Sequence, residues 1–258
     1  MKRVQVKKEK FNNEPVQWLD EKDSKIGFFK VNDNFSIPSI AINIAFKVAN
    51  GQSPQTDSTK DLSSAITEDA AERSTIKSQA LSHIIADVWN TRLRKISNQI
   101  SFSRAAVSVK VSLDTINLFV VAPEEIFERV IENVVSMINI SGSQLAADEI
   151  AQAKITTMRF MKGNSSTIKK AVSNYDSLII KELKNNEKIL NFYQTSKPSE
   201  TQFEKPIIQY LFVEGDTSQS MAKRYAGKFF DQFQRTSEKW SLPLIQNFNH
   251  KNLRIYRS

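Results

Sequence analysis

The sequence predicts an α+β fold in which helices pack on one face of a mixed, mostly antiparallel sheet. Residues 40–46 alternate strictly between large apolar side chains and small or polar ones, which is typical of a strand with one fully apolar face. Residues 76–95 repeat apolar side chains every three to four positions, which is typical of an amphipathic helix. A strand pair is expected over residues 107–121, and antiparallel pairs joined to helices point to an α+β arrangement.

The N-terminal part of the chain supplies the first strands of this sheet. Residues 26–31 form a short apolar run ahead of the alternating strand, so two strands are expected here. Residues 1–24 are basic and polar, and they predict an N-terminal arm with one anchor, Trp18-Leu19. Residues 51–73 are dominated by Ser, Thr, Asp, Gln and Ala, and they predict a flexible surface loop with room for a short helical turn at its acidic end.

The middle of the chain predicts a helix, a hairpin and a second helix. Ser74 or Thr75 can cap the helix over residues 76–95, because a hydroxyl oxygen accepts from the unpaired amides of a first turn. The alternating residues of 107–121 turn back on themselves as a hairpin. The next helix is expected over residues 123–138, and the proline at its start suits a first helical turn.

The C-terminal half predicts further helices, one strand and a polar end. A single domain is expected over residues 25–235, followed by a C-terminal tail over residues 236–258. The remaining elements are helices at 146–162 and 167–184 with a break at 163–166, an irregular piece at 185–205, a buried strand at 207–213, a turn at Gly215-Asp216, a last helix carrying Met221, Tyr225, Phe229 and Phe233, and an edge strand at 253–256.

Composition indicates an ordinary globular chain. It has 258 residues, of which 40% are hydrophobic and 25% are charged, and this length can bury a sizeable core. There are no cysteines, so neither a disulfide framework nor a thiolate metal site is expected. No apolar run reaches the roughly 20 residues that cross a bilayer, and the N-terminus lacks the apolar core of a secretory signal. We therefore expect a cytoplasmic protein.

The net charge of +8 is concentrated at the two ends of the chain. Residues 1–10 and 249–258 together carry seven of the eight excess positive charges. A nucleic-acid-binding domain usually carries its basic stripe on a folded face, with aromatic side chains among the cations. This distribution makes nucleic-acid binding an unlikely function of the folded part.

The two histidines do not form a zinc hydrolase motif. Such a site needs three protein ligands and a base beside the metal-bound water, and His-x-x-Glu-His supplies two ligands and the base from one helix. After His83 the positions required for Glu and His hold Ala86 and Asp87. We interpret His83 and Asp87 as helix-surface residues, while His250 lies in the tail without a motif around it.

Other catalytic constellations are not found either. The chain has six glycines, no Gly-x-Ser-x-Gly elbow and no phosphate-binding glycine loop. Adjacent Glu124 and Glu125 do not face each other on a helix, so they are better explained as favourable charges at a helix start. Four aromatic residues at helical spacing are better explained by core packing than by a ligand pocket: Tyr225, Phe229, Phe230 and Phe233. No catalytic, cofactor-binding or metal-binding residue is predicted.

Phe29-Lys30, Asp33, Phe35 and Pro38 precede the alternating apolar strand, and this series resembles the start of the third domain in pitrilysin/insulinase-type zinc metallopeptidases. That domain begins with an aromatic-Phe-Lys run, followed by Asp and Phe, then Pro and an alternating apolar strand. The corresponding residues in this sequence are Phe29-Lys30, Asp33, Phe35 and Pro38.

The resemblance continues downstream and covers roughly residues 15–245. Residues 149–164 are similar to the family's long helix that ends in Asn. Residues 211–230 resemble its strand, its Gly-Asn/Asp turn at Gly215-Asp216, and its final helix. The chain departs from the family in the longer loop at 51–73, in the lack of a glycine before the hairpin, and in residues 185–205, which look too short for the helix before the last strand.

Membership in this family would imply a non-catalytic domain of a zinc metallopeptidase. These proteases are built from related α+β domains in two halves that enclose a peptide substrate in a chamber. The first domain carries the zinc-binding His-x-x-Glu-His helix, and the third is a degenerate copy without it. The resemblance thus implies a processing-peptidase-type domain that binds no cofactor itself, with zinc only in a catalytic partner domain or subunit.

Three hypotheses remain open at this point. The chain is either a piece of such a peptidase assembly or a stand-alone protein-binding module, self-associating or not, on the same fold without a protease role. A third hypothesis is a nucleic-acid binder that acts electrostatically through its basic tails. The sequence does not identify which residues would contact a substrate.

Overall fold

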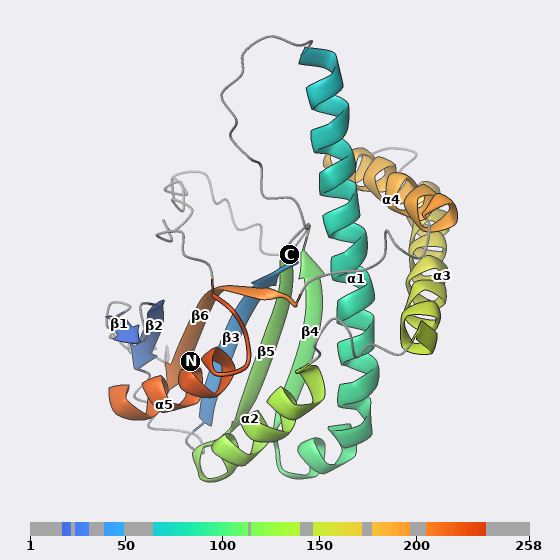
Figure 1. The fold of residues 1–258 in the computed structure, drawn as a ribbon. Coiled ribbons are helices and arrows are strands. Elements are labelled where there is room, and N and C mark those ends of the chain that lie inside the picture. Colours follow the sequence, from blue (N-terminus) through green and yellow to red (C-terminus); the bar gives the residue numbers. More distant parts are fainter. Residues whose placement is uncertain are drawn as a thin grey trace, which may run out of the picture.

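The computed structural model of the protein describes residues 17–21, 24–30, 39–48, 64–112, 115–139, 147–171, 177–196 and 205–235. Figure 1 shows their arrangement as one sheet with helices beside it. The strands are β1 (Gln17–Glu21), β2 (Ser24–Lys30), β3 (Ser39–Lys47), β4 (Ala106–Ser112), β5 (Thr115–Pro123) and β6 (Ile207–Gly215); the helices are α1 (Ser64–Phe102), α2 (Glu124–Ile138), α3 (Ala147–Ala171), α4 (Ser177–Thr195) and α5 (Gln219–Phe230).

The strands form one six-stranded sheet in the order β1-β2-β6-β3-β5-β4. Strand β6 is parallel to β2, and the other neighbouring strands are antiparallel. The predicted mixed, mostly antiparallel sheet is therefore confirmed. The two strands expected at the start of the sheet are not neighbours, because β6 from the C-terminal part of the chain lies between them.

One face of the sheet is covered by α1, α2 and α5 (Figure 1). The alternating side chains of β3 point into this layer, and all four are fully buried: Ile40, Ile42, Ile44 and Phe46. At the centre of the layer, the Phe46 ring lies 5.1 Å from Trp89 of α1 and 5.0 Å from Phe233, measured between ring centroids. Such edge contacts between aromatic rings add to the energy of burial. The helices therefore pack on one face, as predicted.

Helices α3 and α4 lie on the far side of α1 from the sheet (Figure 1). The Tyr193 hydroxyl of α4 donates a 2.7 Å hydrogen bond to the Ala80 carbonyl of α1. The Arg92 guanidinium of α1 donates two hydrogen bonds, of 3.0 and 2.6 Å, to the Glu149 carboxylate of α3. A bidentate pair of this kind fixes the relative orientation of two helices.

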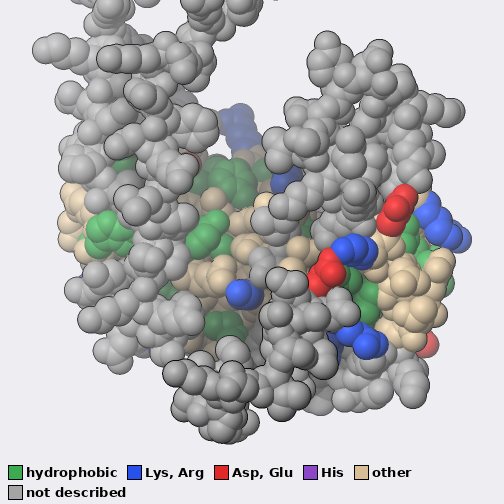
Figure 2. Space-filling model, turned by 90° about the horizontal axis from the view of Figure 1, so that it is seen from above, with side chains coloured by type: hydrophobic (Ala, Val, Ile, Leu, Met, Phe, Trp, Pro, Cys, Tyr) green, Lys and Arg blue, Asp and Glu red, His purple; other side chains and the backbone are tan. Residues whose placement is uncertain are grey.

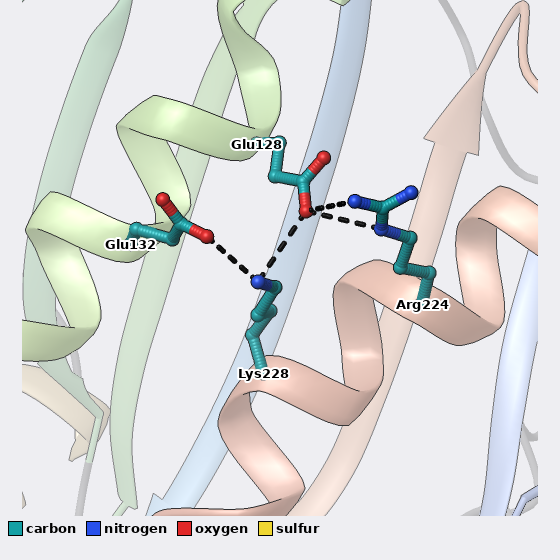
Figure 3. A network of polar contacts seen from close by, with 4 residues as sticks. All are labelled: Glu128, Glu132, Arg224 and Lys228. Atoms are coloured by element: carbon teal, nitrogen blue, oxygen red, sulfur yellow. Dashed lines mark hydrogen bonds and ion pairs between the residues drawn. The ribbon is translucent and has the colours of Figure 1, made fainter.

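Helices α2 and α5 are joined side by side on the sheet (Figure 3). Arg224 donates hydrogen bonds of 3.0 and 2.7 Å to the Glu128 carboxylate. Lys228 lies between two carboxylates, 2.7 Å from Glu132 and 3.3 Å from Glu128. Although desolvation acts in the opposite direction, hydrogen bonds from Arg224 and Lys228 lower the pKa of Glu128. The network fixes the register of the two helices on the outer surface.

Three predicted helix boundaries were wrong. Helix α1 begins at Ser64, inside the segment expected to be a loop, because residues 64–73 are rich in Ala and Glu, which favour helix. Helix α3 continues through the break expected at residues 163–166. The last turns of α4 occupy residues 185–195, expected to be irregular, because Ile189 and Tyr193 bury one apolar stripe there.

One further expectation is corrected at the N-terminal end of the sheet. The N-terminal arm contains strand β1, in which Leu19 is buried and paired with Ile26 of β2; the expected anchor at Trp18-Leu19 is thus part of the sheet. In the turn between α1 and β4, Arg104 adopts a positive φ of 59°, a conformation that glycine adopts more readily. The expected strand at 253–256 lies outside the described residues.

Candidate functional site

The histidine tested as a metal ligand is partly buried within the helical layers. His83 is on α1, and burial lowers its pKa to about 4. It was expected at the helix surface; this was wrong, because α1 is covered by α3 and α4 in addition to the sheet. Among the residues that the structure describes, no group of three or more His, Cys, Asp or Glu side chains is placed to hold a metal ion.

The buried imidazole predicts a loss of stability in mild acid. At pH 7, His83 is neutral in both the folded and the unfolded chain. As the pH falls through 6.5, the unfolded chain takes up a proton that the folded chain accepts only near pH 4, so the free energy of unfolding decreases across this window. We expect a decrease of about 2 kcal/mol by pH 4.5, discounted for partial exposure.

Denaturant unfolding of the full chain and of His83→Gln at pH 7 and pH 4.5 measures this effect. The variant should lack most of the acid-induced decrease. Burial raises the pKa of Asp87, partly offset by the charge of Arg94, and this carboxyl acts in the opposite direction at the acidic end because the folded chain then binds the additional proton. Equal decreases in the two proteins would show that His83 does not carry the effect.

The other residues considered in the sequence have structural roles where they are described. Glu124 and Glu125 are exposed in the first turn of α2, as predicted for charges at a helix start. The four C-terminal aromatics are buried in the core, although Phe233 lies in the turn after α5 and not within it: Tyr225, Phe229, Phe230 and Phe233. His250, Asp33, Phe35 and Pro38 lie outside the described residues.

The sheet face opposite α1, α2 and α5 carries an unusual number of aromatic side chains. Trp18 and Phe119 are 38% and 37% exposed, although both belong to strands. The strand register places one residue of each strand in a single row across this open face: Trp18, Gly27, Phe212, Asn43, Phe119 and Ser108. This row, with the positions on either side of it, is the candidate functional site.

Gly27 makes room for the aromatic part of the row. A Cβ atom at this position would lie 2.2 Å from the Phe212 ring, so the ring lies over the glycine backbone of β2. The Trp18 ring meets Phe212 edge-on, with 5.7 Å between ring centroids, and Tyr210 meets it at 5.6 Å. The three rings form one aromatic cluster over β1, β2 and β6.

From Ala41 to Ala45, strand β3 presents only short side chains to the open face. Ala45 is fully buried, because Tyr210 on one side of it donates a 3.2 Å hydrogen bond to the Asn117 side chain on the other. Asn43, the next outward position, is exposed. The open face thus has an amide group at its centre, between Phe212 and Phe119.

The end of the molecule seen from above in Figure 2 also carries charge. Hydrophobic side chains of the described residues appear there beside Lys and Arg side chains. Lys47 and Lys110 are exposed and belong to the outward rows nearest this end. Glu214, on the opposite side of the aromatic row, is exposed as well.

A second surface feature lies between α2 and α5, near the ends of both helices. It is a hollow of about 320 Å³. Asn139 donates to Gln232 and accepts from Lys205, both at 2.6 Å, beside this hollow. Its lining residues are Glu132, Val135, Ser136, Asn139, Lys228, Asp231 and Gln232. Within this lining Lys228 donates to Glu132 and Asn139 donates to Gln232, so the hollow is a weaker candidate than the open sheet face.

Comparison with solved structures places the fold among known proteases. The chain is similar to pitrilysin, with a TM-score of 0.56 and 13% sequence identity over 91% of this chain. It is also similar to a protease from Helicobacter pylori, with a TM-score of 0.55 and 8% identity over 89% of this chain. At these low identities, the structural similarity shows a shared fold. No protein-family model matches the chain, and no curated protein matches its sequence.

The chain spans only part of each of these proteins. Its match covers 23% of the pitrilysin chain and 52% of the H. pylori chain. Its fold therefore corresponds to a part of each of these two proteins. In the part of the chain that the structure describes, no helix has the length and apolar character needed to span a membrane.

Proposed function

We propose that the chain is a non-catalytic domain of a pitrilysin-type peptidase, which helps to enclose peptide substrates for a zinc-bearing partner of the same fold. The fold shared with pitrilysin supports a place in such an assembly, by analogy of fold. The observation that carries the peptide-binding role is the open sheet face, where an exposed amide lies in one row with aromatic side chains of the neighbouring strands. Exposed apolar patches of this kind mark binding surfaces.

The metal and the catalytic base would come from the partner. Neither histidine of this chain belongs to a His-x-x-Glu-His motif, and His83 is partly buried in the helical layers. A partner domain or subunit would supply the zinc ligands and the base that activates water. This chain would contribute binding surface and positioning.

The test is metal analysis combined with a peptidase assay. We expect the purified chain to hold no stoichiometric zinc and to cleave no peptide alone. If a chain that carries His-x-x-Glu-His is encoded nearby in the genome, mixing the two chains should produce peptidase activity that is lost on chelation. Bound zinc with chelator-sensitive cleavage by this chain alone would overturn the non-catalytic role, and failure to associate would overturn the assembly.

A stand-alone peptide-binding module is the second candidate. The same open face favours it, because peptide binding there requires no catalytic partner. The module is supported if the chain binds peptides but neither associates with the zinc-bearing chain nor increases its activity. Nucleic-acid binding through the basic tails is the third hypothesis; it requires that deletion of residues 1–10 and 249–258 abolish binding and that affinity fall steeply with salt.

A further inference from the structure

The centre of the open face has the geometry of a subsite for one large apolar side chain. Asn43 of β3 is flanked by Phe212 of β6 and Phe119 of β5 in the same row. Because neighbouring strands are about 4.8 Å apart, the backbones of these two phenylalanines are about 10 Å apart. The position between them carries a short amide side chain.

The orientation of Phe212 leaves this position accessible. Its ring lies over Gly27, on the side of β6 away from Asn43, as shown by the 2.2 Å approach of the ring to a Cβ built on the glycine. Phe119, 37% exposed, forms the opposite wall. Tyr210 and Asn117 meet across the next row and close one end. Asn43 remains exposed between these walls.

Charged side chains lie on a diagonal through the same point. Glu214 of β6 pairs with Ala41, which is two residues before Asn43 on β3. It therefore lies one strand over and two residues along from Asn43, a separation of about 8 Å. Lys110 of β4 lies in the opposite direction, level with Ala45, which is two residues after Asn43 on β3. It is therefore two strands over and two residues along from Asn43, a separation of about 12 Å. Both side chains are exposed. An extended chain rises about 3.3 Å per residue, so two to four residues of peptide span each distance.

We propose that this face selects extended peptides in which a large apolar residue stands between a basic residue and an acidic one. The apolar side chain would pack between Phe119 and Phe212, and the Asn43 amide would hydrogen-bond the peptide backbone. The basic residue would lie near Glu214 and the acidic residue near Lys110. This inference rests on the proposed function, and it names the class of peptide that the enclosed surface takes.

Fluorescence anisotropy with the full chain tests the apolar subsite. The probe is a labelled ten-residue Gly/Ser peptide that carries one Phe, a Lys two residues before the Phe and a Glu three residues after it. A second probe with the reversed sequence tests binding of the peptide in the opposite chain direction. Phe119→Ser should weaken binding about tenfold. The matched control is Phe160→Ser on α3, since Phe160 is 64% exposed and remote from this face, and it should leave affinity unchanged.

A charge exchange tests the diagonal. Lys110→Glu should weaken binding of the probe about threefold, and a probe with Lys in place of its Glu should regain that loss on the variant. The subsite would be overturned if Phe119→Ser and Phe160→Ser changed the affinity for the probe equally, or if the exchanged probe did not regain affinity for Lys110→Glu. Neither result would affect the proposed enclosure of substrate, which the peptidase assay with the zinc-bearing partner tests separately. The subsite would also be overturned if the wild-type chain bound no probe. If the chain were a dimer that Phe119→Ser dissociates, the face would belong to an interface with a second copy, and the peptide subsite would again be overturned.

Discussion

Replacing Gly215 by valine should destabilise the protein by at least about 3 kcal/mol. Gly215 ends β6 with a φ of 135°, in a region that side-chain-bearing residues rarely occupy. A Cβ atom there would lie 2.4 Å from the Ser39 carbonyl oxygen and 2.9 Å from the Ile40 Cα. Both atoms are backbone of β3, so the strand pair itself would have to move. Thermal unfolding should show a midpoint lowered by roughly 10 °C.

Gly227 provides the matched control for this substitution. It lies within α5, and a Cβ at this position meets nothing within 4 Å. Gly227→Ala should therefore raise stability by about 1 kcal/mol, because alanine is the better helix former. If Gly215→Val unfolded at the same temperature as the wild type, the close approach between β6 and β3 would be wrong.

Truncating Phe46 to alanine should cost about 3–5 kcal/mol. Its ring is fully buried and contacts Trp89 and Phe233 at centroid distances of 5.1 and 5.0 Å. The cluster connects the sheet, α1 and the turn after α5, so the cavity would loosen three parts of the fold. Urea unfolding should show a lower midpoint with an unchanged slope.

Phe160, an exposed phenylalanine of α3, is the control that distinguishes the effect of burial from the effect of removing a phenylalanine. Phe160 is 64% exposed, and Phe160→Ala should change stability by less than about 0.5 kcal/mol. Similar losses for Phe46→Ala and Phe160→Ala would contradict the central position of the aromatic cluster.

Much of the fold could be predicted because its central strands are long and regular. The residues of β3 and β4 alternate without interruption, so the type of these strands and the faces that they bury followed from a period of two. Strand β5 was expected as the hairpin partner of β4, although its alternation ends in a continuous apolar run from Leu118 to Ala122. Strand β1 was missed because it has five residues, of which Gln17, Asp20 and Glu21 are polar. Strand β1 belongs to the sheet because it pairs with β2, and its mostly polar sequence gives no indication of that pairing.

The candidate site was beyond sequence reasoning for a related reason. Phe119 and Phe212 are outward positions of strands far apart in the chain, and they flank Asn43 only because β6 inserts between β2 and β3. Alternation identifies the two faces of each strand but not the order of strands. The one local signal was Tyr210 and Phe212, two aromatics at alternate positions of a strand whose other face is also apolar.

The insertion of β6 also determines when the protein can fold during synthesis. Strand β2 is hydrogen-bonded to β1 and β6, and β3 to β5 and β6. Until residues 207–215 have left the ribosome, the N-terminal hairpin of β1 and β2 has no attachment to the rest of the sheet, and β2 and β3 each expose an unpaired edge. Nascent chains stalled before β6 should therefore be prone to aggregation, which makes chaperone protection most important until residues 207–215 have emerged.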